Sequence, residues 1–425
     1  MRIGILTYHC VPNYGAQLQA LSTVCYLKKA GYVPIMLNWY PKDLQDMYEK
    51  RVGQEQIKAH DDFTKTYLPV TETCRNEKDL IDAIKKNKID RIVVGSDALF
   101  KYTPLIKRFS LDRAHYKIKR KHVVSCEKLE GNPFFGEFLK SLSSDIKAAA
   151  FSVSSQNCPF NTMLPTEKKK MKRALENYSY ISVRDSWTQK MVENVLGKDT
   201  IRISPDPVFS FNQNCEDIIP SKDQILKKYN LPTNYVLLSF GKHYTNKKYV
   251  EDIINELKQK GLTSVWLPMP EDAFTVSAVD VLISTPLNPM DWYSLIKYSC
   301  GYIGERMHPI VVSLHNSIPF YCFDEYGIKT FTGRGLKREY NKETSKTYLI
   351  VKRAGLLENL FSYKENTDFP HVSIVVNGIL NFDKTKCSEF ARNVQDDYQQ
   401  CMKDVLKKIL SLIPQHYSLT LFISA

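Results

Sequence analysis

The chain has 425 residues, of which 43% are hydrophobic and 25% are charged, as in an ordinary globular protein. Its length exceeds what one hydrophobic core usually serves, so two or three domains are expected. No apolar run approaches the ~18 residues of a membrane span, and polar residues interrupt the N-terminus where a signal peptide would be apolar. These features predict a cytoplasmic protein.

The cysteines and the charge exclude several classes of function. The ten cysteines form no CxxC pair and fit reduced structural thiols, and no residue cluster has the spacing of a metal site. The formal net charge of +13 reflects in part a solvated basic helix face at residues 168–173. A peripheral contact with the inner face of an anionic membrane is the alternative use of this charge. No nucleic-acid-binding motif is present.

The N-terminal residues predict the opening of a parallel α/β sheet. A buried strand is expected at residues 3–6, a helix at residues 18–27 and a second strand at residues 33–37. The loop that follows the first strand leads to Asn13 and Gly15, at the edge of the sheet where such folds bind ligands. These two residues are candidate contacts to a sugar or a phosphate, or simply the turn that starts the helix.

Two further strands end at polar residues on the same edge of the expected sheet. The strand at residues 89–94 is followed by Asp97, whose carboxylate can orient an acceptor hydroxyl or bond the backbone of its own turn. The strand at residues 180–183 ends at Arg184, directly before a helix. An arginine at that position is a candidate anion ligand.

Residues 211–233 contain paired charges and two prolines, as in a linker, and strands and helices alternate before and after them. Two successive βα halves predict an α/β fold of two Rossmann-like domains facing a cleft, the glycosyltransferase-B-like architecture. The expected domains are residues 1–210 and 234–345. A C-terminal extension, residues 346–425, is expected to contain a helix that packs back across both domains.

The second half of the chain contains a candidate anion site. A short apolar strand ends at Gly304, and Pro309 is well tolerated at the first position of a helix, so that His308 falls at or beside the N-cap. Arg306 and His308 then lie at the positive end of this helix, where backbone N–H groups bind anions. Lys329 follows the next strand and is expected in the loop beyond it.

Several segments, in this order along the chain, resemble the signature of the polysaccharide pyruvyl transferases. They are Asn13-Tyr14-Gly15-Ala16-Gln17-Leu18-Gln19, Gly95-Ser96-Asp97, Ser182-Val183-Arg184-Asp185, Asp206-Pro207, and Arg306 with His308 before a hydrophobic helix and Lys329. The resemblance extends from residue 1 to about residue 330. It departs from the commonest pattern after Asp97, where many family members have glutamine and tryptophan.

The resemblance implies transfer of a pyruvyl (carboxyethylidene) group from phosphoenolpyruvate to two hydroxyls of a sugar in a polysaccharide or its precursor. The products are a pyruvate ketal and phosphate. Under this resemblance His308 is the acid that protonates the methylene carbon of the donor, and Arg184, Arg306 and Lys329 clamp its carboxylate and phosphate. Glu305 is a candidate partner of Arg306 or His308, or a base for a hydroxyl.

The resemblance also assigns sides to the cleft. Residues 1–210 are expected to hold the saccharide acceptor, free or lipid-linked, with Asn13, Gly15 and Asp97 as its contacts, and residues 234–345 to hold the donor. No cofactor is expected, because phosphoenolpyruvate is itself a substrate. No metal is expected either, because the sequence has no cluster of metal ligands and the cationic clamp makes a metal ion superfluous.

Two other functions are compatible with the sequence. A glycosyltransferase of the same architecture that uses a sugar nucleotide would bind a nucleoside diphosphate and ignore phosphoenolpyruvate. A non-catalytic saccharide-binding protein would still bind sugar after His308→Ala. The chain has no Walker lysine and no GxGxxG after its first strand, which argues against nucleotide hydrolysis and dinucleotide binding.

Overall fold

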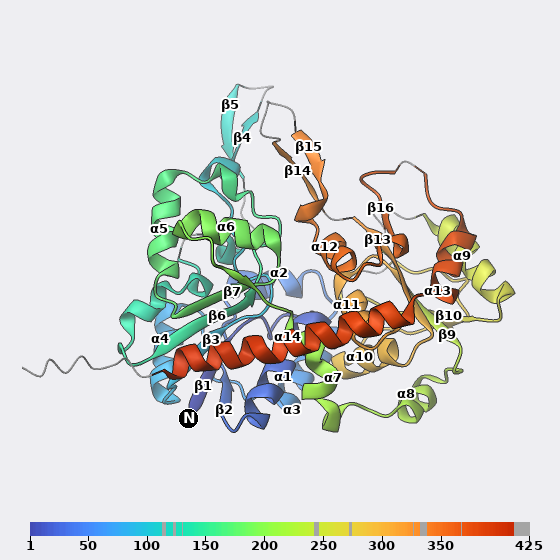
Figure 1. The fold of residues 1–425 in the computed structure, drawn as a ribbon, viewed down its shortest axis with the longest axis horizontal. Coiled ribbons are helices and arrows are strands. Elements are labelled where there is room, and N and C mark those ends of the chain that lie inside the picture. The colour runs from blue at the N-terminus through green and yellow to red at the C-terminus, as the bar shows by residue number, and fades with distance from the viewer. Residues whose placement is uncertain are drawn as a thin grey trace, which may run out of the picture.

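Two parallel β-sheets, one in each half of the chain, form the framework of the protein (Figure 1). Each sheet has six strands, and the strand pairings within both sheets are parallel. The computed structural model describes residues 1–112, 116–121, 125–129, 131–241, 246–271, 274–325, 327–331, 338–366 and 368–411.

The first sheet has the strand order β2-β1-β3-β6-β7-β8. Its strands are β1 (Arg2–Leu6), β2 (Val33–Met36), β3 (Arg91–Val94), β6 (Lys147–Val153), β7 (Tyr180–Val183) and β8 (Arg202–Ile203). The helices of this half are α1 (Tyr14–Lys29), α2 (Lys42–Glu49), α3 (Gln54–Tyr67), α4 (Glu77–Lys86), α5 (Pro165–Leu175) and α6 (Ser186–Leu196). Both faces of a parallel sheet are covered, so its strands are apolar along their length. Accordingly Ile3, Ile5 and Leu6 of β1 are fully buried.

The second sheet has the order β11-β10-β9-β12-β13-β16. Its strands are β9 (Tyr235–Ser239), β10 (Thr263–Trp266), β11 (Val281–Leu282), β12 (Gly301–Gly304), β13 (Phe320–Asp324) and β16 (Leu360–Ser362). The helices of this half are α9 (Lys247–Gln259), α10 (Pro289–Lys297), α11 (Met307–His315), α12 (Lys346–Arg353) and α13 (Val372–Leu380). The prediction of two Rossmann-like α/β domains is confirmed. The second sheet extends to β16, beyond the expected domain end at residue 345.

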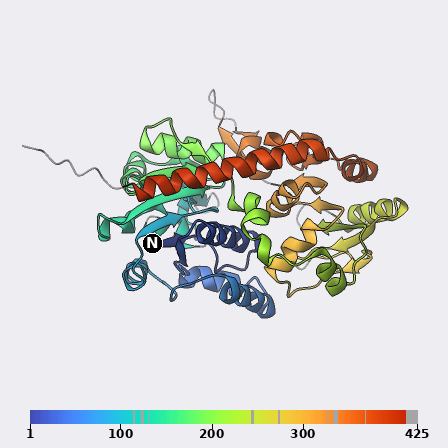
Figure 2. The same cartoon turned by 60° about the horizontal axis from the view of Figure 1, so that its bottom comes forward.

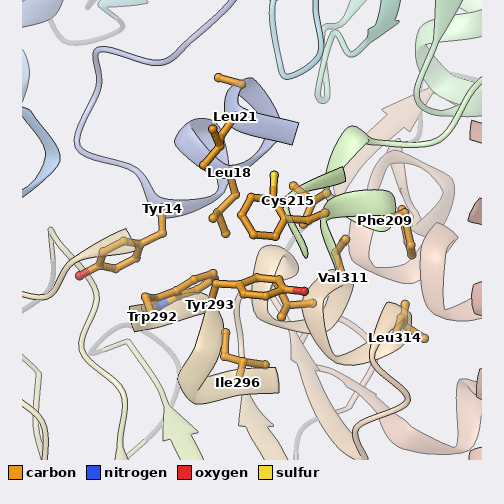
Figure 3. Packing of buried hydrophobic residues seen from close by; sticks show 14 of the residues in the cluster. Tyr14, Leu18, Leu21, Phe209, Cys215, Trp292, Tyr293, Ile296, Val311 and Leu314 are labelled. Atoms are coloured by element: carbon orange, nitrogen blue, oxygen red, sulfur yellow. The ribbon is translucent and has the colours of Figure 1, made fainter. Parts of the chain in front are cut away.

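An apolar core joins the two domains (Figure 3). Leu18 and Leu21 of α1 pack in the same buried cluster as Tyr293 and Val311 of α10 and α11. At the edge of this cluster the ring of Tyr14 stacks on Trp292, with centroids 5.0 Å apart and planes 18° apart. Interfaces between domains usually allow motion unless they are large and hydrophobic. This interface therefore holds the two sheets in a fixed relation.

The connection between the domains is folded. Residues 211–233, expected as a linker, contain α7 (Phe211–Asn214) and α8 (Lys222–Tyr229). Phe211 and Ile225 are buried in the core that the domains share. The apolar residues of this segment thus contribute to the contact between the domains as well as connecting them.

The long C-terminal helix α14 (Lys384–Leu410) crosses both domains (Figures 1 and 2). It packs on α11 in the second domain and on β3, β6 and β7 in the first. Tyr398 of α14 is fully buried and meets Tyr26 of α1 edge to face, with ring centroids 5.7 Å apart. The helix therefore ties the two sheets together on the side where it lies.

Two hairpins project from the framework on the same side in Figure 1. They are β4 (Phe109–Asp112) with β5 (Lys117–Arg120), and β14 (Ile328–Phe331) with β15 (Arg338–Asn341). Over the described residues, no helix is both long enough and apolar enough to span a bilayer.

Candidate functional site

A cavity of about 510 Å³ lies where the two domains meet, and we call it the interdomain cavity. Residues that follow β1, β3 and β12 line it. Strand order reverses beside β1 and β3 in one sheet and beside β12 in the other, and α/β sheets bind ligands at such positions. The charged or titratable residues of its lining are Tyr8, Tyr14, Tyr48, Arg51, Asp97, Lys101, Glu127, Lys128, Glu271, Arg306, His308 and Lys346.

Three helices start at the interdomain cavity. Asn13 is the N-cap of α1, and its Oδ1 accepts a hydrogen bond of 3.1 Å from the Ala16 N–H. Arg306 is the N-cap of α11, and Lys346 is the first residue of α12. First-turn N–H groups have no intrahelical acceptor and carry the positive end of the helix dipole. The three helix starts together favour an anion in the cavity.

Helix α11 begins earlier than the sequence indicated. It starts at Met307, so Pro309 is its third residue and His308 its second. The prediction that Pro309 begins the helix is therefore wrong. A proline is tolerated anywhere in the first turn, because the N–H groups there have no intrahelical partner.

The imidazole of His308 occupies space that Gly15 leaves open. A Cβ on Gly15 would lie well inside 3.0 Å of three atoms of the His308 ring, a distance that real side chains do not reach. The ring therefore lies against the backbone of the first turn of α1. Gly15 thus acts by its size, since any side chain at this position would displace the histidine.

One ring nitrogen of His308, in the cavity wall, makes no hydrogen bond to the described residues. This nitrogen, Nε2, is buried without such a partner, a state that a bound ligand would relieve. Burial lowers the pKa of His308, while the carboxylates of Asp206 and Asp97 oppose this shift. The imidazole is consequently neutral near pH 7 when the cavity holds no anion.

Asp97, in the cavity wall, is held by a buried arginine. Arg184 donates a 2.5 Å hydrogen bond from Nη1 to Asp206 Oδ2, and its Nη2 lies 3.6 Å from Asp97 Oδ1. Burial alone would raise the pKa of Asp97, but Arg184, followed by His308 and Lys346, lowers it below the usual value. Arg184 is only 6% exposed and lies outside the lining of the interdomain cavity. Its charge is therefore matched by two carboxylates of the protein, and it positions Asp97.

Lys346 is a cavity residue that sequence reasoning did not select. It lies in the segment that was assigned to the C-terminal extension, and only the fold brings the start of α12 to the cavity. Burial lowers the pKa of Lys346 to about 7, the charge of Arg184 adds to this shift, and Asp97 opposes it. A lysine in this state becomes fully charged when an anion binds beside it.

Glu127 is a second cavity residue that sequence reasoning did not select. Tyr8, in the loop after β1, donates a 2.5 Å hydrogen bond from its hydroxyl to Glu127 Oε2. Lys101 lies over the Tyr8 ring, with its Nζ 5.4 Å from the centroid. Burial raises the pKa of Glu127 to about 7, while the Tyr8 hydrogen bond and Lys101 oppose this shift. The carboxyl group can therefore take up and release a proton near neutrality.

The structure separates the remaining expected site residues. Arg306 lines the cavity and lies 3.8 Å from Glu325, whereas Lys329 is exposed on β14 and outside the cavity lining. Glu305 is buried and also outside the lining, and its carboxylate accepts 2.8 Å hydrogen bonds from the Gly241 N–H and the Tyr363 hydroxyl. These hydrogen bonds hold the start of the loop after β12 to Gly241 and Tyr363. Within the part of the chain that the structure describes, no group of three metal-ligating side chains is assembled.

A comparison of the sequence with protein families identifies the family of this chain. The model of one family, described as polysaccharide pyruvyl transferase, matches residues 13–325. The chain belongs to the polysaccharide pyruvyl transferase family. The expected family is thus confirmed, and the protein is a transferase enzyme of polysaccharide pyruvylation that acts on a saccharide. Lys346 lies outside the matched range.

Solved structures of other enzymes share the fold of this pyruvyl transferase. UDP-GlcNAc 2-epimerase from Neisseria meningitidis, bound to UDP-GlcNAc, matches with a TM-score of 0.54 at 9% identity over 96% of this chain and 100% of that chain. UDP-GlcNAc 2-epimerase from Methanocaldococcus jannaschii gives 0.52 at 12% identity over 95% and 99%. Arabidopsis thaliana UGT89C1 complexed with UDP gives 0.51 at 10% identity over 96% and 99%. At these identities the likeness shows the glycosyltransferase-B-like fold alone. The comparison with curated proteins found no match.

Proposed function

We propose that this enzyme transfers the pyruvyl group of phosphoenolpyruvate to two hydroxyls of a saccharide in the interdomain cavity, forming a pyruvate ketal and releasing phosphate. The observation that carries the proposal is the placement of His308. Its unpaired Nε2 lies in a cavity that three helix starts and the lysines and arginines of the lining make favourable for an anion. Family membership supports pyruvyl transfer to a saccharide. The chemistry of the cavity supports phosphoenolpyruvate as the donor.

The donor is a trianion, and the cavity offers positive groups from both domains. Arg306 provides a planar fork for a carboxylate or a phosphate, and Lys346 provides a point charge. The backbone N–H groups at the starts of α1, α11 and α12 supply further donors. Because the pKa of Lys346 is about 7 without a ligand, binding of the donor would draw a proton onto its amine.

His308 is the group that delivers the proton to carbon. Its pKa is lowered in the free enzyme, and a bound trianion would raise it again, so the donor itself favours the charged imidazolium. The proton passes from His308 to the methylene carbon, which becomes a methyl group. Positive charge then develops on the adjacent carbon, and Asp97, which is kept ionised by Arg184, stabilises it.

Glu127 is the group that accepts the proton of an attacking hydroxyl. The first acceptor oxygen forms a bond to the cationic carbon as its proton passes to Glu127, and the bond from this carbon to the phosphate oxygen then breaks. The second hydroxyl closes the ring of the ketal. The two protons that the hydroxyls lose end on the methyl group and on phosphate, so the reaction needs no oxidant or reductant.

Titration calorimetry with phosphoenolpyruvate tests the proposal directly. The wild type is expected to bind saturably, Arg306→Ala to lose binding, and Lys329→Ala to keep it, because Lys329 lies outside the cavity. Release of phosphate in the presence of candidate saccharides then identifies the acceptor. Binding of a nucleoside diphosphate without binding of phosphoenolpyruvate would favour sugar-nucleotide-dependent glycosyl transfer instead. Saccharide binding that survives His308→Ala, with no phosphate release, would favour a non-catalytic role.

A further inference from the structure

The hairpin of β4 and β5 exposes more apolar surface than the framework around it. Of the thirteen large hydrophobic side chains that are exposed among the described residues, six lie in and beside this hairpin. They are Leu105, Ile106, Phe109, Leu111, Tyr116 and Ile118. Figure 1 shows the hairpin projecting away from both sheets. Clustered apolar side chains on a projecting element mark an interaction surface.

The pairing of the two strands gives the hairpin an apolar face and a basic face. Leu111 pairs with Ile118, so their side chains share one face, and they are 62% and 73% exposed. Ser110 pairs with Lys119, and Lys117 lies two positions before Lys119 on the opposite face. A two-stranded hairpin has no second layer of its own to cover an apolar face. The apolar face is therefore available to a partner outside the chain.

The charge of the hairpin and its flanking residues indicates which kind of partner it binds. Residues 105–121 contain seven lysines and arginines and a single acidic residue, Asp112. Arg120, which pairs with Phe109, is exposed on the same face as Leu111 and Ile118. Lys117, which begins β5, and Lys121, which follows it, are also exposed. A bilayer with anionic lipids offers both a negative surface and an apolar interior, and it matches this combination of side chains. From this match we infer that the β4–β5 hairpin docks the enzyme on the surface of a bilayer that contains anionic phospholipid.

Two other occupants fit the hairpin less well. A second copy of the chain, packed face to face on the same hairpin, would bring two strongly basic segments together and be opposed by repulsion between like charges. A polyanion such as an acidic polysaccharide would match the lysines but leave Leu111 and Ile118 in water. Only the bilayer buries the apolar face and pairs the basic residues at once.

The hairpin is directly continuous with the wall of the interdomain cavity. Lys101 lines the cavity before the hairpin, and Ser125, Glu127 and Lys128 line it after the hairpin. The second hairpin, β14 and β15, projects on the same side in Figure 1 and leads to Lys346. Docking through β4 and β5 would thus place the cavity close to the membrane surface, where a membrane-borne acceptor is found. The docking itself does not depend on the reaction proposed above.

Sedimentation of the full chain with lipid vesicles tests this inference. The wild type is expected to sediment with vesicles of phosphatidylcholine that contain about 30 mol% phosphatidylglycerol, and to remain in solution with phosphatidylcholine alone. Leu111→Asp with Ile118→Asp, and separately Lys117→Glu with Lys121→Glu, should each weaken binding to the anionic vesicles by about tenfold or more. Because these side chains are exposed, the variants should unfold at the temperature of the wild type.

Matched controls come from other exposed sites. Ile374→Asp removes an exposed apolar side chain of α13, and Lys222→Glu with Lys227→Glu reverses two exposed charges of α8, far from the hairpin in Figure 1. Both controls should bind vesicles like the wild type. Absence of wild-type binding, or binding that the hairpin variants retain, would overturn the inference. A dimer in sedimentation velocity that is lost in Leu111→Asp with Ile118→Asp would assign the apolar face to a second copy instead.

Discussion

The ring of His308 lies against Gly15, so that a residue of the second domain is positioned by the first helix of the first domain. This contact joins the two parts of the family signature that are most distant in the sequence. The contact between the His308 ring and the Gly15 backbone is steric. It makes the orientation of His308 dependent on the packing of the two domains against each other.

Gly15→Ala is expected to reduce activity without unfolding the protein. The added Cβ would overlap the His308 ring and displace it, and a shift of about 1 Å in a reacting group can cost about 100-fold in rate. Alanine also favours a helix by up to about 1 kcal/mol relative to glycine, which offsets part of the clash in stability. Steady-state kinetics and thermal unfolding measure the two effects separately.

The control for this substitution is Gly53→Ala. A Cβ on Gly53 meets no atom within 4 Å, so this variant should retain activity within about twofold. If Gly15→Ala kept wild-type activity, the histidine would not depend on this contact, and the steric role assigned to Gly15 would be wrong.

Arg184→Gln is expected to destabilise the fold, because it leaves Asp97 and Asp206 buried without their cation. Removal of one partner from a buried ion pair usually costs about 3–5 kcal/mol, and chemical denaturation measures this loss. Lys248→Gln breaks an exposed ion pair with Asp252 that solvent screens, so its stability should stay close to that of the wild type. A second substitution, Asp97→Asn, should recover part of the stability lost by Arg184→Gln. No recovery in the double variant would mean that Arg184 does not act through Asp97.

The two sheets, and the cavity residues that directly follow strands, could be predicted from the sequence for a physical reason. Residues directly after strands lie at the carboxyl edge of a parallel sheet. Asn13, Gly15 and Asp97 could therefore be placed at this edge of the first sheet, and His308 at this edge of the second, from the order of strands alone. Lys329 follows a strand in the same way, yet the chain continues into a hairpin that carries it outward. A local pattern could not reveal the direction of that hairpin.

The positions of the other cavity residues depend on tertiary packing, which no local sequence pattern reveals. Glu127 lies in a segment of short irregular elements, and at the cavity its side chain accepts a hydrogen bond from Tyr8, a residue 119 positions away in the sequence. Glu305 shows the converse case, because it is adjacent in sequence to Arg306 but its carboxylate bonds Gly241 and Tyr363. Neighbours in a loop point in different directions, so sequence adjacency could not assign Glu305 to either role.

Glu127→Gln is expected to remove the acidic limb of the pH profile. The carboxylate accepts a proton only when it is ionised, and kcat/KM reports the ionisation of the free enzyme, so wild-type kcat/KM should fall as the pH drops below about 7, the pKa of this group. The variant should lose between about 100-fold and 10,000-fold in kcat/KM, with no remaining dependence on this ionisation. A full pH profile of kcat/KM for both proteins checks this. A variant that retained the acidic limb would assign it to another group.

The same substitution has an expected effect on stability. Burial raises the pKa of Glu127 from 4.5 to about 7, so the folded protein binds a proton that the unfolded chain releases. Ionisation of this buried group therefore destabilises the wild type progressively as the pH rises from 4.5 to 7, by up to about 3 kcal/mol. Glu127→Gln removes this penalty, and its stability relative to the wild type should be greater at pH 8 than at pH 4. Chemical denaturation at the two pH values measures the difference.

Comparison of Lys346→Met with Lys329→Met decides which lysine holds the donor. Lys346 lines the interdomain cavity, and loss of a charged partner of a bound anion should weaken phosphoenolpyruvate binding by roughly 10-fold to 100-fold. Lys329 is exposed on β14, so Lys329→Met should leave the affinity nearly unchanged. Because the pKa of Lys346 is about 7 in the free enzyme, the wild type should also take up a proton on binding at pH 8, and Lys346→Met should take up less. Calorimetry in buffers of different ionisation enthalpy measures the proton uptake. The opposite ranking of the two variants would place the donor at the β14–β15 hairpin and refute the assignment of Lys346.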